Sequence, residues 1–373
     1  MADTSQRVAN PPRPVGAGIA GPAFVEDFSF QNELRRRVDE YFAASGRRKR
    51  DCWQMYVKTA VVLTTFALVY GLLVFGAQTW WQGVPLAVLL GLLTAEIGFN
   101  VQHDGGHKAY SEHTWVNRLM AWSMDLIGSS SYRWRWKHTV IHHMYVNITG
   151  YDDDVNLGVL ARVTPHQPRR GYHRWQHLYV WPVYGFLAMK MQLVDDFRFV
   201  ILGRLGEHRV ARPTRGPLVT FIVGRAIFFA WAFAIPMLFH PVWVVLFYYA
   251  VGSLVLGTVL ALVFLTPHLV ELADFPMPDE KLRRMDTPWA VHQARVTVDF
   301  GRDSRIVTWL LGGLNYHKEH HLFPLICHVN YPAISKIVER TCLDFNLPYR
   351  AHRSFLAGIA AHYRWLRRMG RSD

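Results

Sequence analysis

Residues 242–268 read VWVVLFYYAVGSLVLGTVLALVFLTPH, and this stretch decides the class of fold. Residues 242–267 contain no charged side chain and exceed the ~20 apolar residues that a helix needs to cross a bilayer. A second apolar stretch, residues 216–239, is separated from the first only by His240 and Pro241. Together the two stretches predict a hairpin of membrane-spanning helices.

The N-terminal half contains a similar pair of apolar stretches. Residues 57–77 and 84–101 are separated by QTWWQG, whose Trp80 and Trp81 suit the interface between membrane and water. The sequence therefore predicts an all-α integral membrane protein with four transmembrane helices in two hairpins. Interfacial helices and a cytosolic helical cap that carries the histidine clusters complete the predicted fold.

Three further segments predict helices that lie at the membrane surface or re-enter it. Residues 29–42 have one apolar and one charged side, with Ser29 as the expected N-cap. Residues 115–128 and 177–193 are apolar but interrupted by charged residues and by Pro182. We do not expect any of the three to cross the membrane.

Small side chains interrupt the second and fourth spans at Gly91, Gly252 and Gly257, among others. Such positions favour close packing of helices within a membrane. They are also consistent with open space for an acyl chain, so no residue is assigned to chain length from the sequence.

The net charge of +13 could indicate nucleic-acid binding, but the positive residues follow the predicted topology. Residues 60–101 contain no Lys or Arg, and residues 216–268 contain only Arg225. The positive-inside bias assigns the charged side to the cytosol. We therefore expect no nucleic-acid partner, and four crossings place both termini in the cytosol. Arg225 predicts a buried ion pair, with Glu96 as a possible partner.

The ends of the chain and the cysteines predict little chemistry. Residues 1–23 have the composition of a disordered tail, residues 24–350 form the expected membrane domain, and residues 351–373 form a basic C-terminal helix or tail. The three cysteines show no CxxC spacing, which predicts ordinary thiols without a disulfide or a thiolate metal site.

Three histidine clusters lie on the cytosolic side of the predicted topology. They are HDGGH at 103–107, HTVIHH at 138–143 and HKEHH at 317–321, and His268 follows the fourth span. Spacings of three and four place side chains on one face of a helix, so two histidines of each cluster can hold one ion. These pairs are His103 with His107, His138 with His142, and His317 with His320 or His321. Adjacent histidines diverge by about 100° on a helix, so two neighbouring ions use them better than one. The candidate ligands are His103, His107, His138, His142, His143, His268, His317, His320 and His321.

Imidazole ligands suit iron, copper, zinc or nickel, so the spacing does not choose the metal. Polar residues near the clusters are expected to accept a hydrogen bond from the ring nitrogen that faces away from the metal. These supporting residues are Asp104, Asp152, Asp154, Glu319 and Asn315. Asp153 is also consistent with a solvated acidic loop. The other histidines, among them His113 and His328, are expected to have ordinary structural roles.

The order HxxxH, HxxxHH and HxxHH between two helical hairpins resembles the membrane-bound fatty acid desaturase family. The likeness continues in WKHTVIHHMYVNITGYDDD and GLNYHKEHHLFPLICHVNYPAIS and covers about residues 24–350. It implies that the nine histidines hold two iron ions, which activate O2 to remove two hydrogens from adjacent carbons of an acyl chain.

The chain departs from its relatives at two positions. Phe264 stands where related acyl-CoA enzymes have an Asn that holds a metal-bound water. His317 stands where front-end and acyl-lipid desaturases usually have Gln, which makes the third cluster more similar to that of acyl-CoA desaturases. The resemblance therefore does not fix the position of the new double bond.

The resemblance also implies partners. The substrate is an acyl chain linked to CoA, lipid or a carrier protein. Electrons come from a separate donor such as ferredoxin or cytochrome b5, because the chain has no haem or Fe–S motif. Basic segments at 132–137, 169–174 and 364–371 are candidate docking surfaces for it. The same site could instead form a hydroxyl, an epoxide or a triple bond. A non-enzymatic metal-binding or transport protein is the alternative of another class, although no ladder of polar residues crosses the spans.

Overall fold

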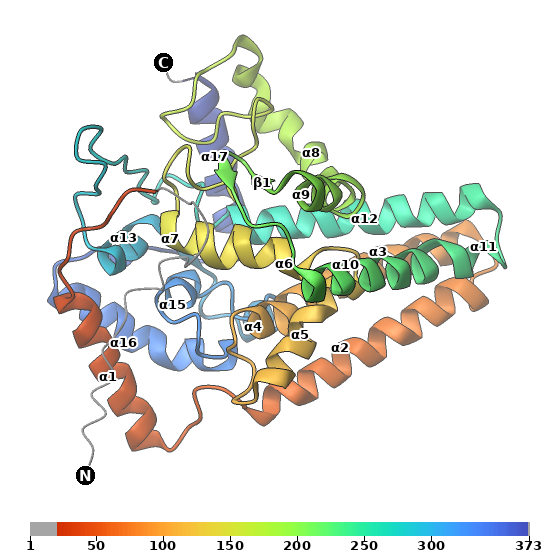
Figure 1. Ribbon diagram of the computed structural model, residues 1–373, viewed down its shortest axis with the longest axis horizontal. Helices are drawn as coiled ribbons and strands as arrows, with labels where there is room; N and C mark the ends of the chain where they lie inside the picture. The colour runs from red at the N-terminus through yellow and green to blue at the C-terminus, as the bar shows by residue number, and fades with distance from the viewer. Residues whose placement is uncertain (1–20, 372–373) are drawn as a thin grey trace.

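The computed structural model describes residues 21–371. Four helices are long and apolar enough to cross a membrane, and they extend together from one side of the molecule (Figure 1). Their bounds are Trp53–Gly76, Trp80–Gly106, Arg215–Met237 and Val242–Leu265. The predicted class is therefore confirmed: the chain is an all-α integral membrane protein. The tail expected over residues 1–23 lies outside the described residues, except for its last three.

Three of the four spans are built from shorter helical segments, and the fourth is a single helix. The first two spans comprise α2 (Trp53–Gly71), η1 (Leu72–Gly76), α3 (Trp80–Ile97), η2 (Gly98–Gln102) and α4 (His103–Gly106). The last two comprise α10 (Arg215–Phe229), η6 (Ala230–Ala234), α11 (Ile235–Met237) and α12 (Val242–Leu265). The second span is longer than predicted because the π-helical turn η2 continues the helix into α4. As a result, His103 lies on the membrane helix itself and not after it.

Glycines bring the central helices into close contact. A Cβ atom at Gly91 of α3 would collide with the carbonyl oxygen of Gly252 in α12. A Cβ atom at Gly257 of α12 would likewise collide with the carbonyl oxygen of Gly185 in α8 (Gln176–Lys190). These glycines therefore serve helix packing, the first of the two roles that the sequence allowed.

The segments between the hairpins do not add spans among the described residues. They form α5 (Thr114–Leu126), α6 (Ser131–Trp134), η3 (Arg135–His142), α7 (His143–Tyr145), η4 (Gly171–Trp175), α8, η5 (Met191–Asp195) and α9 (Asp196–Leu202).

Arg225 of α10 forms its ion pair with Asp196 at the start of α9, so the expected partner Glu96 was wrong. Glu96 instead accepts a hydrogen bond from Asn100, one turn along its own helix.

A cap of helices and short strands covers the other end of the bundle. Its helices are α1 (Ser29–Ser45), α13 (Trp289–Val296), α14 (Arg305–Leu310), α15 (His317–Leu322), η7 (His328–Asn330), α16 (Tyr331–Asp344) and α17 (Phe355–Arg371). Strands β1 (Arg204–Leu205) and β2 (His208–Arg209) pair antiparallel, and β3 (Asp299–Phe300) and β4 (Ala351–His352) pair parallel. The expected N-cap was wrong, because Phe28 occupies the N-cap position and Ser29 is the first helical residue, whose N–H donates to the carboxylate of Asp27.

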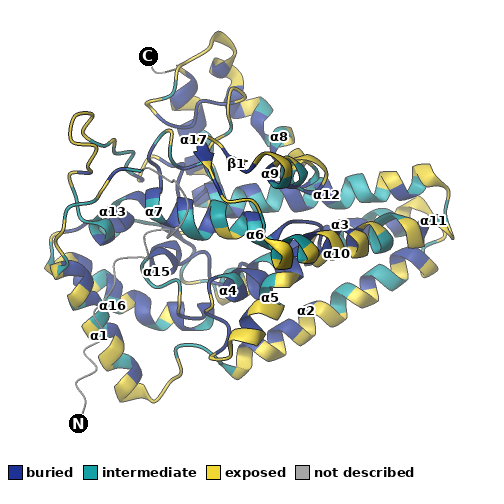
Figure 2. Cartoon of the chain, in the orientation of Figure 1, coloured by how far each residue is buried: buried dark blue, intermediate teal, exposed yellow. Residues whose placement is uncertain are grey.

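The outer side of the helical bundle is exposed, whereas the junction between bundle and cap is buried. Exposed residues follow the outer side of α2, whereas α4 and α15 are mostly buried where the bundle meets the cap (Figure 2). Leu68, Leu72 and Phe75 are each more than half exposed, as expected for side chains that face lipid. The histidine clusters lie at this buried junction.

Candidate metal centre

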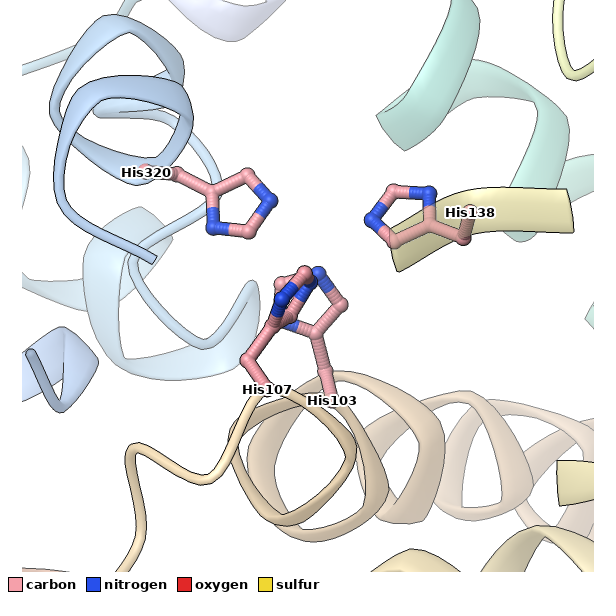
Figure 3. A group of neighbouring side chains, drawn as sticks. All are labelled: His103, His107, His138 and His320. Atoms are coloured by element: carbon pink, nitrogen blue, oxygen red, sulfur yellow. The ribbon is translucent and has the colours of Figure 1, made fainter. Parts of the chain in front are cut away.

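The structure brings all nine candidate histidines into one buried region. Four of them converge from three separate segments, α4 with the residue after it, η3 and α15 (Figure 3). This first group consists of His103, His107, His138 and His320. One nitrogen of each ring lies within 4.8 Å of one nitrogen of every other, and none of the four side chains is appreciably exposed.

A second group of four adjoins the first and consists of His142, His268, His317 and His321. His143 lies between the two groups, within the same 4.8 Å limit of His320 and His321. The adjacent residues His320 and His321 thus belong to different groups. This is the divergence that neighbouring positions on a helix require, and it gives space for two ions rather than one.

The π-helical form of η3 alters the expected pairing in the second cluster. A π-helix bonds residues five apart, so His143 returns to the side of His138. Their Nε2 atoms are 3.3 Å apart. His142 stacks on His138 with ring centroids 5.1 Å apart, yet it belongs to the other group of four. Spacing counted on an α-helix predicted His138 with His142 as the pair, and these two do share a further candidate group with Asp154. The spacing did not predict that His143 also approaches His138.

The ring nitrogens at the centre fit metal ligation. No described protein group bonds to the buried Nε2 atoms of His103, His107, His320 and His321. The Nε2 atoms of His268 and His317 are 2.8 Å apart. Metal–imidazole bonds are ~2.1 Å long, so two ligands at a right angle place their nitrogens about 3 Å apart. The observed separations match that spacing.

Partners on the opposite ring nitrogen fix the orientation of several histidines. The Nδ1 of His138 lies 2.8 Å from a carboxylate oxygen of Asp154. The Nδ1 of His142 lies 3.0 Å from both oxygens of Asp152. An N–H at Nδ1 that donates to a carboxylate leaves the Nε2 lone pair free for a metal.

Other partners were not predicted from the sequence. Gln293 of α13 lies with its side-chain oxygen 3.0 Å from the Nδ1 of His321. The amide of Asn147, which has a left-handed φ of 58°, donates to the carbonyl of His268, and its backbone N–H donates to Asp152. A positive φ favours Asn, but one sequence gives no other signal for either residue.

The remaining predicted supporting residues have different contacts. Asp104 accepts hydrogen bonds at 3.1 Å from the backbone and the ring of His328, and it lies 3.9 Å from the ring of His103. Glu319 accepts from the hydroxyl of Tyr349, and Asn315 donates to the hydroxyl of Thr308. In the described part of the chain, the side chains of Glu319 and Asn315 therefore form no hydrogen bond with a histidine of the two groups.

Burial keeps most of the central imidazoles neutral. It lowers the pKa of His317, His320 and His321 well below the ordinary value, and it lowers the pKa of His138 to about 4 despite Asp154. For His142 the burial is outweighed by Asp152, so its pKa is raised. Neutral imidazoles carry the lone pairs that a cation requires.

A mainly apolar cavity of about 110 Å³ adjoins the first group. Its lining includes His138 and Trp134 at one side and Leu256, Leu260 and Phe264 of α12. A second cavity of about 80 Å³ lies deeper in the bundle. Thr94, Gln192 and Leu256 line both cavities, so the two are neighbours. The lining suits a hydrocarbon chain better than a polar ligand.

Known proteins are similar in sequence to this chain over most of its length. The sn-1 linoleoyl-lipid 6-desaturase of Arthrospira platensis is 36% identical over 93% of this chain and 94% of its own length. The sn-1 linoleoyl-lipid 6-desaturase of Synechocystis sp. is 31% identical over 94% of this chain and 98% of its own length. The acyl-lipid (8-3)-desaturase of Physcomitrium patens is 34% identical over 94% of this chain and 74% of its own length. The family model for fatty acid desaturases matches residues 78–353, and the chain therefore belongs to the fatty acid desaturase family.

Proposed function

We propose that this protein introduces a C=C bond into the acyl chain of a membrane lipid at a pair of histidine-bound iron ions. The observation that carries the proposal is the pair of adjoining four-histidine groups beside a mainly apolar cavity. Iron supplies the O2-dependent removal of hydrogen that side-chain acid–base chemistry cannot perform. His143 lies beside His320 and His321 of the two groups and would serve as a ligand to one of the ions.

The residues of this chain position the metals and exclude water. Asp152 and Asp154 hold His142 and His138 with Nε2 directed inward. Phe264 lies with its ring centroid 5.7 Å from that of His138, where it closes an apolar wall against the first group. A dry, shaped site is what the protein contributes to this type of chemistry.

The two neighbouring cavities would hold the acyl chain. Each buried CH2 group contributes about 0.8 kcal/mol, so an apolar channel binds a fatty acyl chain without polar contacts along its length. The polar part of the first cavity lies close to His138, where Arg133 and Lys137 line it together with the aspartates that pair with them. We place the polar end of the substrate there and its methyl end in the deeper cavity.

The relatives favour an ester-linked lipid over the other substrate forms. The three relatives described above are named as acyl-lipid or linoleoyl-lipid desaturases. A lipid substrate also reaches the bundle directly from the bilayer. His317 in place of the usual Gln leaves the position of the new double bond to experiment.

A separate electron donor completes the proposed reaction. Two of the three basic segments meet in the structure, because Gly370 of α17 packs against the backbone of His173 in η4. We call five of their exposed arginines the basic patch: Arg170, Arg174, Arg367, Arg368 and Arg371. In the third segment, Arg133 and Lys137 pair with Asp196 and Asp154, so only Arg135 remains as an exposed cation there. The basic patch is therefore the better surface for an acidic donor of the ferredoxin or cytochrome b5 type.

The topology that accompanies this function places the metal centre and both chain ends on the cytosolic side. The distribution of Lys and Arg supports this orientation. Residues 24–350 would form the desaturase domain, with 351–373 as a basic C-terminal extension.

Lipid analysis in a host without the activity tests the proposal. Mass spectrometry should show acyl chains that have lost two hydrogens, and His320→Ala should abolish this product while the protein still inserts. His113→Ala changes an exposed histidine and serves as the matched control. Metal analysis should give two irons per chain. A product that gains oxygen would indicate hydroxylation, and tight zinc without O2-dependent turnover would contradict the proposal.

A further inference from the structure

Two of the three cysteines meet outside the metal centre. The sulfur atoms of Cys52, which precedes α2, and Cys327, which precedes η7, are 3.2 Å apart. The sequence does not predict this contact, because 274 residues lie between the two cysteines. Both thiols are free. Closing the gap to the ~2.05 Å of a disulfide requires a shift of only about 1 Å.

The two segments that carry these cysteines are already docked. The backbone N–H of Cys327 donates to the carbonyl of Lys49 at 2.9 Å, and the side-chain amide of Asn330 donates to the carbonyls of Arg48 and Lys49. The same amide lies 3.4 Å from the sulfur of Cys327. A cross-link would therefore form within an existing contact and would not require the backbone to rearrange.

One of the two sulfurs is open to small reagents. Cys52 lines an open pocket of about 450 Å³ together with Arg47, Arg48 and Asn330. The contact with Cys327 lowers the pKa of Cys52 to about 7, although burial opposes this. Cys327 is fully buried, so oxidation can begin only at Cys52.

We propose that Cys52 and Cys327 form a peroxide-sensitive dithiol that closes to an intramolecular disulfide. Hydrogen peroxide is the oxidant: the Cys52 thiolate attacks one oxygen, the O–O bond breaks, and Cys52 sulfenic acid and hydroxide form. The Cys327 sulfur then attacks the sulfenic sulfur and the S–O bond breaks with release of water. Two thiols and one peroxide thus give one disulfide and two waters.

The position of the disulfide connects it to the metal centre. His328 follows Cys327 directly, and both its backbone N–H and its ring bond to Asp104, the neighbour of His103. The other ring nitrogen of His328 lies 3.1 Å from the Nζ of Lys58 in α2. Oxidation would fasten the start of α2 to the loop that holds Asp104. Because the cross-link concerns thiols alone, it does not depend on the proposed reaction.

Thiol counting on the full-length protein in detergent tests the proposal. After treatment with hydrogen peroxide, denaturation and maleimide labelling, intact mass should show two fewer labelled thiols. Peptide mapping should find Cys52 joined to Cys327, and dithiothreitol should restore both labels. Cys342, buried in another cluster, is the internal control and should keep its label.

Two variants separate the steps of the reaction. Cys327→Ser should trap the sulfenic acid at Cys52, which dimedone captures, whereas Cys52→Ser should leave Cys327 unmodified. Retention of all three labels at peroxide concentrations that sulfenylate Cys52 in the Cys327→Ser variant would overturn the proposal. A disulfide that involves Cys342, or only links between chains, would overturn it as well.

Discussion

Asp152 approaches the Nδ1 of His142 with both carboxylate oxygens at 3.0 Å, whereas Asp153 beside it forms no hydrogen bond to a histidine of the described residues. Substitutions at Asp152 and Asp153 therefore distinguish loss of the hydrogen bond to His142 from loss of a negative charge. Loss of a partner that orients a ligand typically lowers metal affinity 10- to 100-fold. We expect Asp152→Asn to lower the affinity for iron by about that factor.

Metal content after dialysis against graded chelator measures this effect. Asp153→Asn removes the same charge one residue away and should retain its iron. Equal iron loss from both variants would assign the effect to net charge. Full retention of iron by Asp152→Asn would show that Asp152 does not support the metal centre.

A substitution where the two cavities meet is expected to change the preference for acyl-chain length. Leu256 lines both cavities, so a larger side chain there would close the passage to the deeper one. We expect Leu256→Trp to lower the ratio of long-chain to short-chain products by about tenfold or more, since each poorly accommodated methylene costs about 1–3 kcal/mol. Competition between acyl lipids of different length, followed by mass spectrometry, measures the ratio.

Leu246→Trp provides the control for that experiment. Leu246 lies on the same helix, is 48% exposed and lines neither cavity. The placement of the substrate would be wrong if Leu246→Trp shifted the product ratio as much as Leu256→Trp did.

The buried pair of Arg225 and Asp196 predicts a stability effect. Asp196 also pairs with Arg133 at 3.2 Å, and Arg133 has Asp195 as a second partner at 3.6 Å. Removing one member of a buried pair costs about 3–5 kcal/mol because the other charge stays uncompensated. We expect Asp196→Asn to lower the Tm in detergent strongly.

The double variant Asp196→Asn with Arg225→Met should recover much of that loss. It removes both charges, and Arg133 keeps Asp195. Thermal unfolding of the two single variants and the double variant measures the coupling. Strictly additive losses would mean that Arg225 and Asp196 do not stabilise each other.

The apolar spans could be predicted because their signal lies in local composition. Residues 242–267 specify a membrane helix wherever they are placed, and the structure ends α12 at Leu265. The convergence of the histidine clusters was expected from the same topology, since the predicted spans leave all three clusters on one side of the membrane.

Features that depend on local backbone geometry could not be predicted in this way. The π-helical turn of η3 changes which residues share a face, so His143 lies on the same side as His138. The ion-pair partner of Arg225 could not be predicted either, because Asp196 and Glu96 carry the same charge. Only the path of α9 in the folded chain shows which of the two lies beside Arg225. The contact of Cys52 with Cys327 is a similar case, since it requires two loops to meet.

The basic patch on α17 and η4 predicts salt-sensitive electron transfer. Arg367 and Arg371 are exposed on α17 beside the η4 segment. We expect the double variant Arg367→Glu and Arg371→Glu to raise the KM for an acidic donor several-fold at low salt with little change in kcat, because rim charges act mainly on association. The variant should also lose the salt dependence of the wild type. Arg353→Glu, another exposed arginine outside the patch, is the control. Equal effects from the control would point to net charge.

The buried His362 predicts acid sensitivity of the fold. It lies 2.8 Å from the carbonyl oxygen of Leu269 through Nδ1 and 2.7 Å from the hydroxyl of Tyr184 through Nε2. Burial lowers its pKa to about 4, against 6.5 when exposed. Between these values the unfolded chain binds a proton that the folded chain does not, so stability falls as pH drops from about 6.5 to 4 and is constant above. We expect His362→Gln to reduce the Tm difference between pH 7.5 and pH 5, while the exposed His113→Gln leaves it unchanged. An unchanged difference in His362→Gln would show that other groups determine the acid sensitivity.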